Sequence, residues 1–295
     1  MNKIITKVRN RILENLYRLP LLSKTSDLAY QAAIDQHIDH LPIISKNDLK
    51  LIEALQNQGI VITSLAALSI PSTPQMYQEA KILMPEISQI ISVNKNEFII
   101  HATSEQMMEH IEIFLWGLQQ NLLNIIENYI GLPIAYHGSY YRRDIVNQVQ
   151  RKSRLWHLDK EDRKVLKVIV YLNNVNEQNG PFQYIPKYFS SKIFNSLKYN
   201  YEYIQDKAMQ TVISPLNWKS CIGASGTVII ADTANIFHRG KIPIDSDRFT
   251  IFFDYTSRRP KHPFYCQTSL SNDNLLKIAT KISETQRQCI FWQKT

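Results

Sequence analysis

The stretch RLWHLDKEDRKVLKVIVYL, residues 154–172, places a histidine and an aspartate just before an apolar, β-branched run. The run at 165–172 predicts a buried strand, because it is apolar almost throughout and rich in valine. Side chains two residues apart share a face of a strand but point about 200° apart on a helix. His157 and Asp159 therefore converge if the chain entering the strand is extended, and the pair is a candidate metal site.

Two similar pairs occur elsewhere, at His37-Ile-Asp39 and His110-Ile-Glu112. The first lies in a segment with helical spacing, and nothing downstream completes a site around it. The second lies inside a predicted helix, where we expect the two side chains to point to opposite sides as a solvated pair. Only the pair before the strand has a geometry that can bind one ion.

The elements around this strand predict an α+β protein. Leu49, Ile52 and Leu55 recur at helical spacing within residues 44–59, with Ser45 or Asn47 as the cap and Gly59 at the end, and a β-branched strand follows at once. Thr103 and Gln106 form a capping box that opens one long helix ending at Gly131. Residues 71–100 are interrupted by prolines and predict no clear element. Short β-type runs follow at 165–172, 180–185, 227–231 and 249–255, which favours a β-sandwich or barrel.

Composition limits the partners and the compartment. The net charge of +8 favours anionic partners, such as carboxylates, phosphorylated thioester carriers or acidic lipid. The basic residues are scattered and match no nucleic-acid-binding motif, so we expect no nucleic acid. The basic, amphipathic start is either an ordinary surface helix or a segment that rests on a membrane or an acidic carrier. Three cysteines without a C-x-x-C, no membrane-spanning run and no signal peptide predict a cytoplasmic protein.

A third metal ligand is available in the second half of the chain. His238 follows the predicted strand at 227–231. Two histidines and one carboxylate suit non-haem Fe(II) and leave positions open for a co-substrate and O2. Arg248 begins the last strand, and Thr250 shares its face, so a guanidinium and a hydroxyl can bind the far carboxylate of 2-oxoglutarate.

These residues carry a family resemblance. The segment WHLDKEDRKVLKVIVYLNNVNEQNGPFQYIP, then HRG, then an arginine, resembles the phytanoyl-CoA dioxygenase-like branch of the Fe(II)/2-oxoglutarate-dependent oxygenases, over residues 154–255. The resemblance implies a double-stranded β-helix (jelly-roll) core with helices outside. It also implies that His157, Asp159 and His238 are the iron ligands, that Arg248 binds 2-oxoglutarate, and that O2 is consumed. The segment KYFS at 187–190 departs from the family's G-S-H.

We expect a single domain over residues 1–295. Residues 1–131 form a mainly helical N-terminal part, 132–260 form the jelly-roll core with the metal site, and 261–295 form a C-terminal extension. Residues before Leu132 align poorly with the family, and substrate specificity is usually decided there.

Further residues are candidates for binding co-substrate or substrate. Lys167 shares a strand face with Ile169 and Tyr171, and that face is either the barrel interior, where the ammonium meets a carboxylate, or the solvent side. Tyr140 and Arg142, in a stretch that we predict as a surface loop, and Tyr171 are candidate substrate contacts. Within 238–240, we expect Arg239 to form a structural ion pair and Gly240 to permit a turn, and 179–181 to form another turn.

The predicted function is hydroxylation of a small or carrier-bound, anionic metabolite in biosynthesis, with release of succinate and CO2. Asp159 stands where related halogenases have a small residue, which favours hydroxyl transfer, while desaturation or ring formation needs the same ligands. The alternatives are a non-catalytic jelly-roll interaction protein and a cupin-type enzyme that uses another divalent metal. Neither alternative requires an arginine at position 248 to bind a carboxylate. The sequence does not indicate the oligomeric state.

Overall fold

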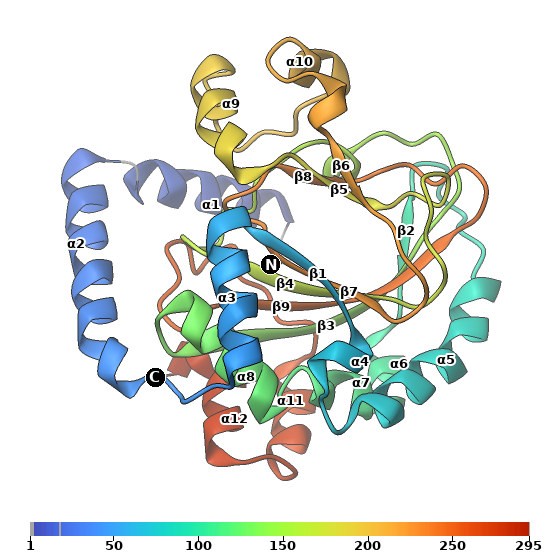
Figure 1. Ribbon diagram of the computed structural model, residues 1–295, viewed down its shortest axis with the longest axis horizontal. Helices are drawn as coiled ribbons and strands as arrows, with labels where there is room; N and C mark the ends of the chain where they lie inside the picture. The colour runs from blue at the N-terminus through green and yellow to red at the C-terminus, as the bar shows by residue number, and fades with distance from the viewer. Residues whose placement is uncertain (1–2, 18, 295) are drawn as a thin grey trace.

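Two antiparallel sheets form the centre of the molecule and lie face to face (Figure 1). The computed structural model describes residues 3–17 and 19–294. In this part of the chain, one sheet has six strands in the order β1-β7-β4-β9-β3-β2, and the other has three in the order β6-β5-β8. The predicted α+β, jelly-roll fold class is confirmed. The strands are β1 Ile60–Ser64, β2 Ile99–His101, β3 Ile134–Asp144, β4 Leu166–Tyr171, β5 Phe182–Tyr184, β6 Lys219–Cys221, β7 Thr227–Asp232, β8 His238–Gly240 and β9 Arg248–Ser257.

Strand alternation separates an apolar outer face of the six-stranded sheet from an inner face. On β4, Leu166, Val168 and Val170 belong to the main core beneath the helices. Ile169 and Tyr171 belong to a second cluster that joins the two sheets. Lys167 shares their side, which settles its direction: it faces the interior between the sheets.

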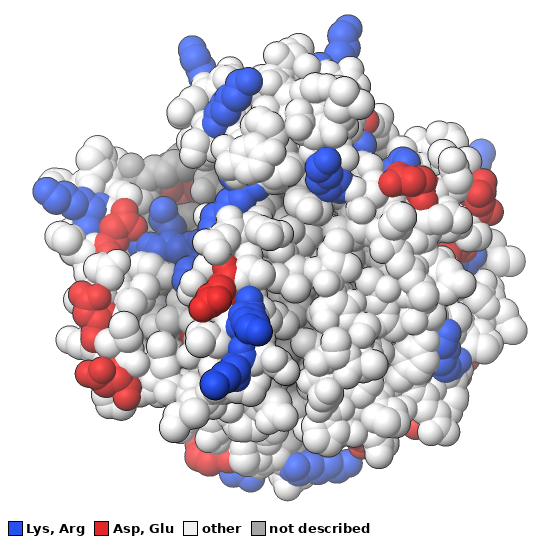
Figure 2. Space-filling view, in the orientation of Figure 1, with Lys and Arg blue, Asp and Glu red and all other residues white. Residues whose placement is uncertain are grey.

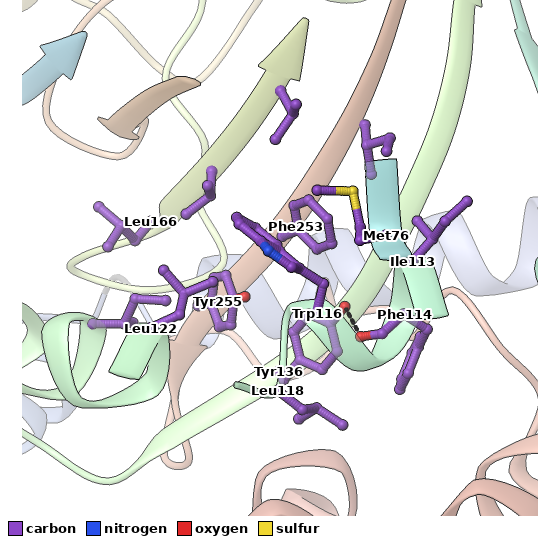
Figure 3. Packing of buried hydrophobic residues seen from close by; sticks show 14 of the residues in the cluster. Met76, Ile113, Phe114, Trp116, Leu118, Leu122, Tyr136, Leu166, Phe253 and Tyr255 are labelled. Carbon is purple, nitrogen blue, oxygen red and sulfur yellow. Dashed lines mark hydrogen bonds between the residues drawn. The ribbon is translucent and has the colours of Figure 1, made fainter. Parts of the chain in front are cut away.

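Helices cover the outer face of the larger sheet. Trp116 packs against Phe253 of β9 with ring centroids 4.8 Å apart, and Phe114 packs against Tyr136 of β3 (Figure 3). Each such side chain stabilises the fold by about 1.5–3 kcal/mol through burial of apolar surface. The helices are α1 Lys3–Tyr17, α2 Pro20–His37, α3 Lys46–Gln58, α4 Leu65–Leu68, α5 Thr73–Gln89, α6 Ser104–Glu109, α7 Ile111–Trp116, α8 Gln120–Ile130, α9 Ser190–Ser196, α10 Asp206–Gln210, α11 Asn272–Ala279 and α12 Glu284–Ile290. Short 3-10 helices lie at Ile38–His40, Lys152–Arg154, Lys187–Phe189, Pro215–Asn217 and Trp292–Lys294.

The long helix predicted after Thr103 is divided into α6, α7 and α8. The capping box forms as predicted, and the last of the three helices ends at Gly131 with φ 81°. At the end of α7 and just beyond it, two buried tyrosines bind backbone carbonyls that would accept intrahelical hydrogen bonds in a continuous helix. Tyr136 Oη donates to Phe114 O at 3.1 Å (Figure 3), and Tyr255 Oη donates to Gly117 O at 2.7 Å. The prediction of one helix was wrong, and at the break between α7 and α8 the hydrogen-bond partners come from strands distant in the sequence.

Two other segments differ from expectation. Residues 71–100, which gave no clear pattern, contain the 17-residue helix α5 with Pro85 inside it. The stretch at 137–144, predicted as a surface loop, lies in β3 and pairs with β9, so that prediction was wrong. Its Arg143 pairs with Asp247 at 2.5 Å rather than facing open solvent. Strands β1 and β2, which come from the part before residue 132, form the two edges of the larger sheet.

Candidate metal centre

His157, Asp159 and His238 meet at one end of the space between the sheets. The extended chain at His157 pairs with β8 through two backbone hydrogen bonds to His238, each 3.1 Å long. This pairing brings the imidazole centroids to 4.2 Å. Asp159 Oδ1 lies 3.8 Å from His157 Nε2, and Oδ2 lies 3.9 Å from His238 Nε2. The three residues present ligand atoms within 4.8 Å of one another, as a two-histidine, one-carboxylate centre requires.

Both imidazoles direct a free lone pair at this point. His157 Nδ1 donates to Leu155 O at 2.8 Å, and His238 Nδ1 donates to Ile236 O at 3.1 Å. Because a carbonyl only accepts, Nδ1 carries the proton in each ring and Nε2 is left as the ligand atom. Burial lowers the pKa of both histidines, for His238 to about 3 with His157 adding to the effect. Both rings are therefore neutral near neutral pH.

Asp159 supplies the charge of the centre. Its Oδ2 atom is buried and accepts no well-directed hydrogen bond, although Lys167 Nζ lies 2.7 Å away as an ion-pair partner. Burial opposes the ionised carboxyl, but Lys167, His238 and His157 outweigh burial and hold its pKa well below the usual range. A buried, ionised carboxylate beside two imidazole lone pairs fits a divalent metal ion.

A second set of unsatisfied groups lies on β9. Alternation along this strand turns Arg248, Thr250, Phe252 and Asp254 toward the interior. Arg248 is 1% exposed, and its Nη2 lies 2.9 Å from Asp144 Oδ2 while Nη1 donates to Gly180 O. Arg248 Nε and Thr250 Oγ1 are buried without a hydrogen-bond partner in the described structure. Two unpaired donors on one strand face fit an anionic group placed between them.

Asp144 fixes the arginines of this region. It binds Arg142 through Nε at 3.0 Å and Nη2 at 2.5 Å, in addition to Arg248. Burial raises the pKa of Asp144, but Arg142 and Arg248 outweigh burial and lower it well below its usual range. Two guanidinium groups share one carboxylate, which leaves an excess positive charge to attract an anion.

One cavity of about 240 Å³ connects the two sets of groups, since His157, His238 and Arg248 all line it. Tyr140, Arg142 and Lys167, which were predicted to contact substrate or co-substrate, line it too. Arg142, Tyr140 and Lys167 face the cavity, whereas Thr250 is fully buried and is not among the described residues that line it. Tyr171 is absent from the described residues that line the cavity, because its hydroxyl donates to Cys221 O at 2.8 Å within the barrel wall.

A second cavity of about 290 Å³ shares Tyr140, Lys167 and Asp254 with the first and extends toward Glu161 and His137. Burial, reinforced by Asp159, raises the pKa of Glu161 to about 7. Burial raises the pKa of Asp254 to about 6 even though Lys167 opposes the shift. The space beside the candidate centre is therefore strongly polar.

The rival pairs have structural roles. His37 Nε2 lies 2.8 Å from Glu127 Oε1. His110 is 9% exposed and its Nδ1 lies 2.6 Å from Glu79 Oε2, so the prediction that His110 and Glu112 form a solvated pair was wrong. The break between α6 and α7 at His110 turns this ring inward.

Arg239 and Gly240 of β8 support the site. Arg239 forms the predicted ion pair, with Asp206, and its guanidinium lies 4.4 Å from the Trp156 ring centroid. Gly240 lies in a strand rather than in the predicted turn. A Cβ at this position would come within 3.1 Å of Arg248 Nη2, so the glycine leaves space for the arginine.

Sequence reasoning missed three charged residues of the interior: Asp144, Glu161 and Asp254. Every second residue of a strand lies on the same face, so Asp254 shares a face with Arg248 in the predicted strand. By the same rule, Asp144 shares a face with Arg142 if that stretch is extended. The signal for these two was therefore present in the alternation. Glu161 lies in a turn, where no periodicity indicates direction.

The fold and the geometry define a jelly-roll protein with a two-histidine, one-carboxylate centre. Comparison with solved structures agrees on the fold. EctD from S. alaskensis in its apoform matches with a TM-score of 0.50 and 18% identity, over 78% of this chain and 84% of that chain. EctD with 2-oxoglutarate and 5-hydroxyectoine matches with a TM-score of 0.50 and 15% identity, over 78% and 89%. HygX from Streptomyces hygroscopicus, with nickel, 2-oxoglutarate and hygromycin B bound, has a TM-score of 0.46 and 14% identity, over 72% and 88%. No family model and no curated protein sequence matches the chain.

Proposed function

We propose that the protein is an Fe(II)/2-oxoglutarate-dependent dioxygenase that hydroxylates an unactivated C–H bond of a small or carrier-bound metabolite. The observation that carries this proposal is that members of two candidate binding sets, His157 and His238 of one and Arg248 of the other, line one cavity. The triad of His157, Asp159 and His238 fits a metal ion, and Arg248 with Thr250 fits a carboxylate. A metal-stabilised fold without turnover, or a cupin using metal alone, has no need of the second set.

Bound Fe(II), with 2-oxoglutarate and O2, would supply oxidation of the substrate with release of succinate and CO2. The protein's part is to hold and orient these groups. Neutral imidazoles at 157 and 238 and the ionised Asp159 provide the ligands, and their hydrogen bonds to backbone carbonyls fix the ring orientation. Arg248, held by Asp144 and Gly180 O, presents Nε and leaves the bound carboxylate little freedom to rotate.

Lys167 was predicted to bind co-substrate, and its contact with Asp159 supports a different role. Its ammonium lies 2.7 Å from Asp159 Oδ2 and neutralises the carboxylate of the triad. Burial disfavours the charge on Lys167, but Asp159, Asp254 and Glu161 outweigh burial and raise its pKa above the usual value. We assign Lys167 to the charge balance of the centre rather than to 2-oxoglutarate.

The substrate is proposed to enter the second cavity, with Tyr140 at the junction of the two cavities and Arg142 on the wall of the first. An anionic group on the substrate would meet Arg142, whose guanidinium also lies 4.6 Å from the Phe252 ring centroid. A structure of EctD that shares the fold holds 2-oxoglutarate together with 5-hydroxyectoine, which supports a small-molecule substrate. Membership of the phytanoyl-CoA dioxygenase-like branch and a role in biosynthesis are part of the same proposal.

Succinate release tests the proposed activity. Purified protein with Fe(II), ascorbate and 2-oxoglutarate is screened against a metabolite panel, and succinate is quantified. We expect a low uncoupled rate without substrate and stimulation by at least one substrate class, both lost in His238→Ala. Failure to consume 2-oxoglutarate under every condition, with unchanged iron content in His238→Ala, would contradict the proposal.

A further inference from the structure

The first helix carries an apolar stripe on its outer side. Ile5, Val8, Ile12 and Leu16 of α1 recur at helical spacing, and each is between 45% and 59% exposed. Leu19, Leu21 and Leu22, just beyond the helix, are between 49% and 82% exposed. Soluble monomers rarely leave such a continuous aliphatic surface uncovered, and larger patches of this kind mark interaction sites.

The opposite side of α1 is bound to the body of the protein. Asn10 Nδ2 donates to Phe264 O at 3.1 Å. Glu14 is 8% exposed and lies 3.1 Å from Lys160 Nζ, while Tyr265 Oη donates to it at 2.6 Å. Tyr17 packs against His262. These contacts fix the rotation of α1 about its axis, so the stripe faces outward.

Charge indicates what kind of surface fits the stripe. At about 100° per residue, Arg9 and Arg11 fall on opposite sides of the stripe, and both are exposed. The only acidic residue of the helix, Glu14, is the one buried against the body. Every exposed charge described along the stripe is therefore positive, which is the arrangement of helices that lie in the plane of an anionic lipid surface.

Other occupants fit less well. A second copy packed stripe to stripe would bring arginines against arginines, in chains that each carry a net charge of +8. A protein partner is usually met by aromatic, methionine or arginine side chains at the interface centre, whereas this stripe is purely aliphatic. Basic residues elsewhere on the visible face stand apart from one another, among acidic residues at the bottom and largely without them over α9 and α10 (Figure 2).

We propose that α1 docks the protein on anionic membranes, with its aliphatic stripe in the headgroup boundary and its arginines on lipid phosphates. None of the described helices has the length and apolar character to cross a bilayer, so the contact is peripheral. The inner side of α1 touches Lys160 and Tyr265, and Tyr265 lines the second cavity. Docking would therefore hold that cavity close to the lipid surface.

Vesicle sedimentation with the full chain tests the proposal. We expect binding to phosphatidylcholine vesicles containing about a third phosphatidylglycerol to exceed binding to pure phosphatidylcholine by tenfold or more, since basic residues are attracted to an anionic lipid surface. Ile12→Glu should weaken binding roughly tenfold or more. Ile91→Glu, at an aliphatic residue that is 87% exposed outside α1, should bind like the wild type and serves as the matched control.

Four outcomes would overturn the proposal. These are equal binding to neutral and anionic vesicles, unchanged binding by a folded Ile12→Glu, lipid-free dimers that Ile12→Glu dissociates, and binding to soluble poly-glutamate as tight as to vesicles. The last two would assign the stripe to a second copy or to an acidic protein. None of these readouts uses metal, 2-oxoglutarate or turnover, so failure of the proposed dioxygenase activity would leave the test intact.

Discussion

Arg248 is held in place before any ligand arrives, because Asp144 and Gly180 O bind its two terminal nitrogens and leave Nε unpaired. Arg248→Met removes the charged donor of the co-substrate site without touching the triad. We expect the Kd for 2-oxoglutarate to rise roughly 100-fold, as for loss of a buried charge-assisted pair, with iron affinity little changed. Calorimetric titration under anaerobic conditions measures both.

Arg258→Met is the control for loss of a half-buried arginine, since Arg258 binds Ile134 O at 3.2 Å outside the cavity. Its Kd for 2-oxoglutarate should match the wild type. Thr250→Val should raise the Kd by a smaller factor than Arg248→Met. Equal affinity for 2-oxoglutarate in the wild type and in Arg248→Met would show that Arg248 does not bind the co-substrate.

Lys167 is the cation among three carboxylates, Asp159, Glu161 and Asp254. Lys167→Met leaves these groups without a counter-charge and should destabilise the metal-free protein by about 3 kcal/mol. A divalent ion at Asp159 restores positive charge, so Co(II) should raise the free energy of unfolding more in the variant than in the wild type. Chemical denaturation with and without Co(II) measures the difference.

Lys164→Met provides the matched control, since Lys164 Nζ binds Tyr129 O at 2.6 Å away from the centre. Its gain in stability on adding Co(II) should equal that of the wild type. A smaller gain in Lys167→Met than in the wild type would mean that the lysine is needed to hold the metal, and would contradict the assigned charge-balancing role.

Strand β3 depends on a bulge between Tyr136 and Gly138, which places Tyr140, Arg142 and Asp144 on the inner face. Gly138 has φ 110°, and a Cβ there would lie 1.9 Å from Ser269 Oγ. Gly138→Ala should lower the free energy of unfolding by about 3 kcal/mol through backbone strain and overlap. Gly226→Ala, at φ 91° with no atom near the added Cβ, should cost only about 1 kcal/mol. If urea denaturation gave equal losses in the free energy of unfolding for the two variants, the proposed overlap with Ser269 would be contradicted.

Strand geometry explains how much of the site the sequence could predict. Regular alternation ties His157 to Asp159 and Arg248 to Thr250, and both pairs lie as predicted on shared faces. The partners that decide their chemistry come from elsewhere: Lys167 and Asp144 reach these pairs across neighbouring strands. Such pairing depends on register, and the register of β3 follows from a bulge that no local pattern marks. The division of the helix after Thr103 escaped prediction for the same reason, since tyrosines from β3 and β9 bind its carbonyls.

Buried neutral histidines make the fold sensitive to acid. Burial, with Lys167 adding to the effect, lowers the pKa of His137 to about 4 from 6.5. The unfolded chain therefore binds more protons than the folded chain between these values, so stability is lost as pH falls from about 6.5 to about 4. The contribution of His137 approaches about 3 kcal/mol at the acid end. His137→Gln should flatten the decline of the free energy of unfolding across this window, and an unchanged slope would contradict the assignment.

Anaerobic titration of the Fe(II) protein with 2-oxoglutarate, followed by the visible charge-transfer absorption, tests the central claim most directly. The geometry of the triad and Arg248 predicts a band that saturates at one 2-oxoglutarate per chain in the wild type. The band should be absent in His238→Ala and should need roughly 100-fold more 2-oxoglutarate in Arg248→Met. A wild-type protein that binds Fe(II) but develops no band at saturating 2-oxoglutarate would contradict the account.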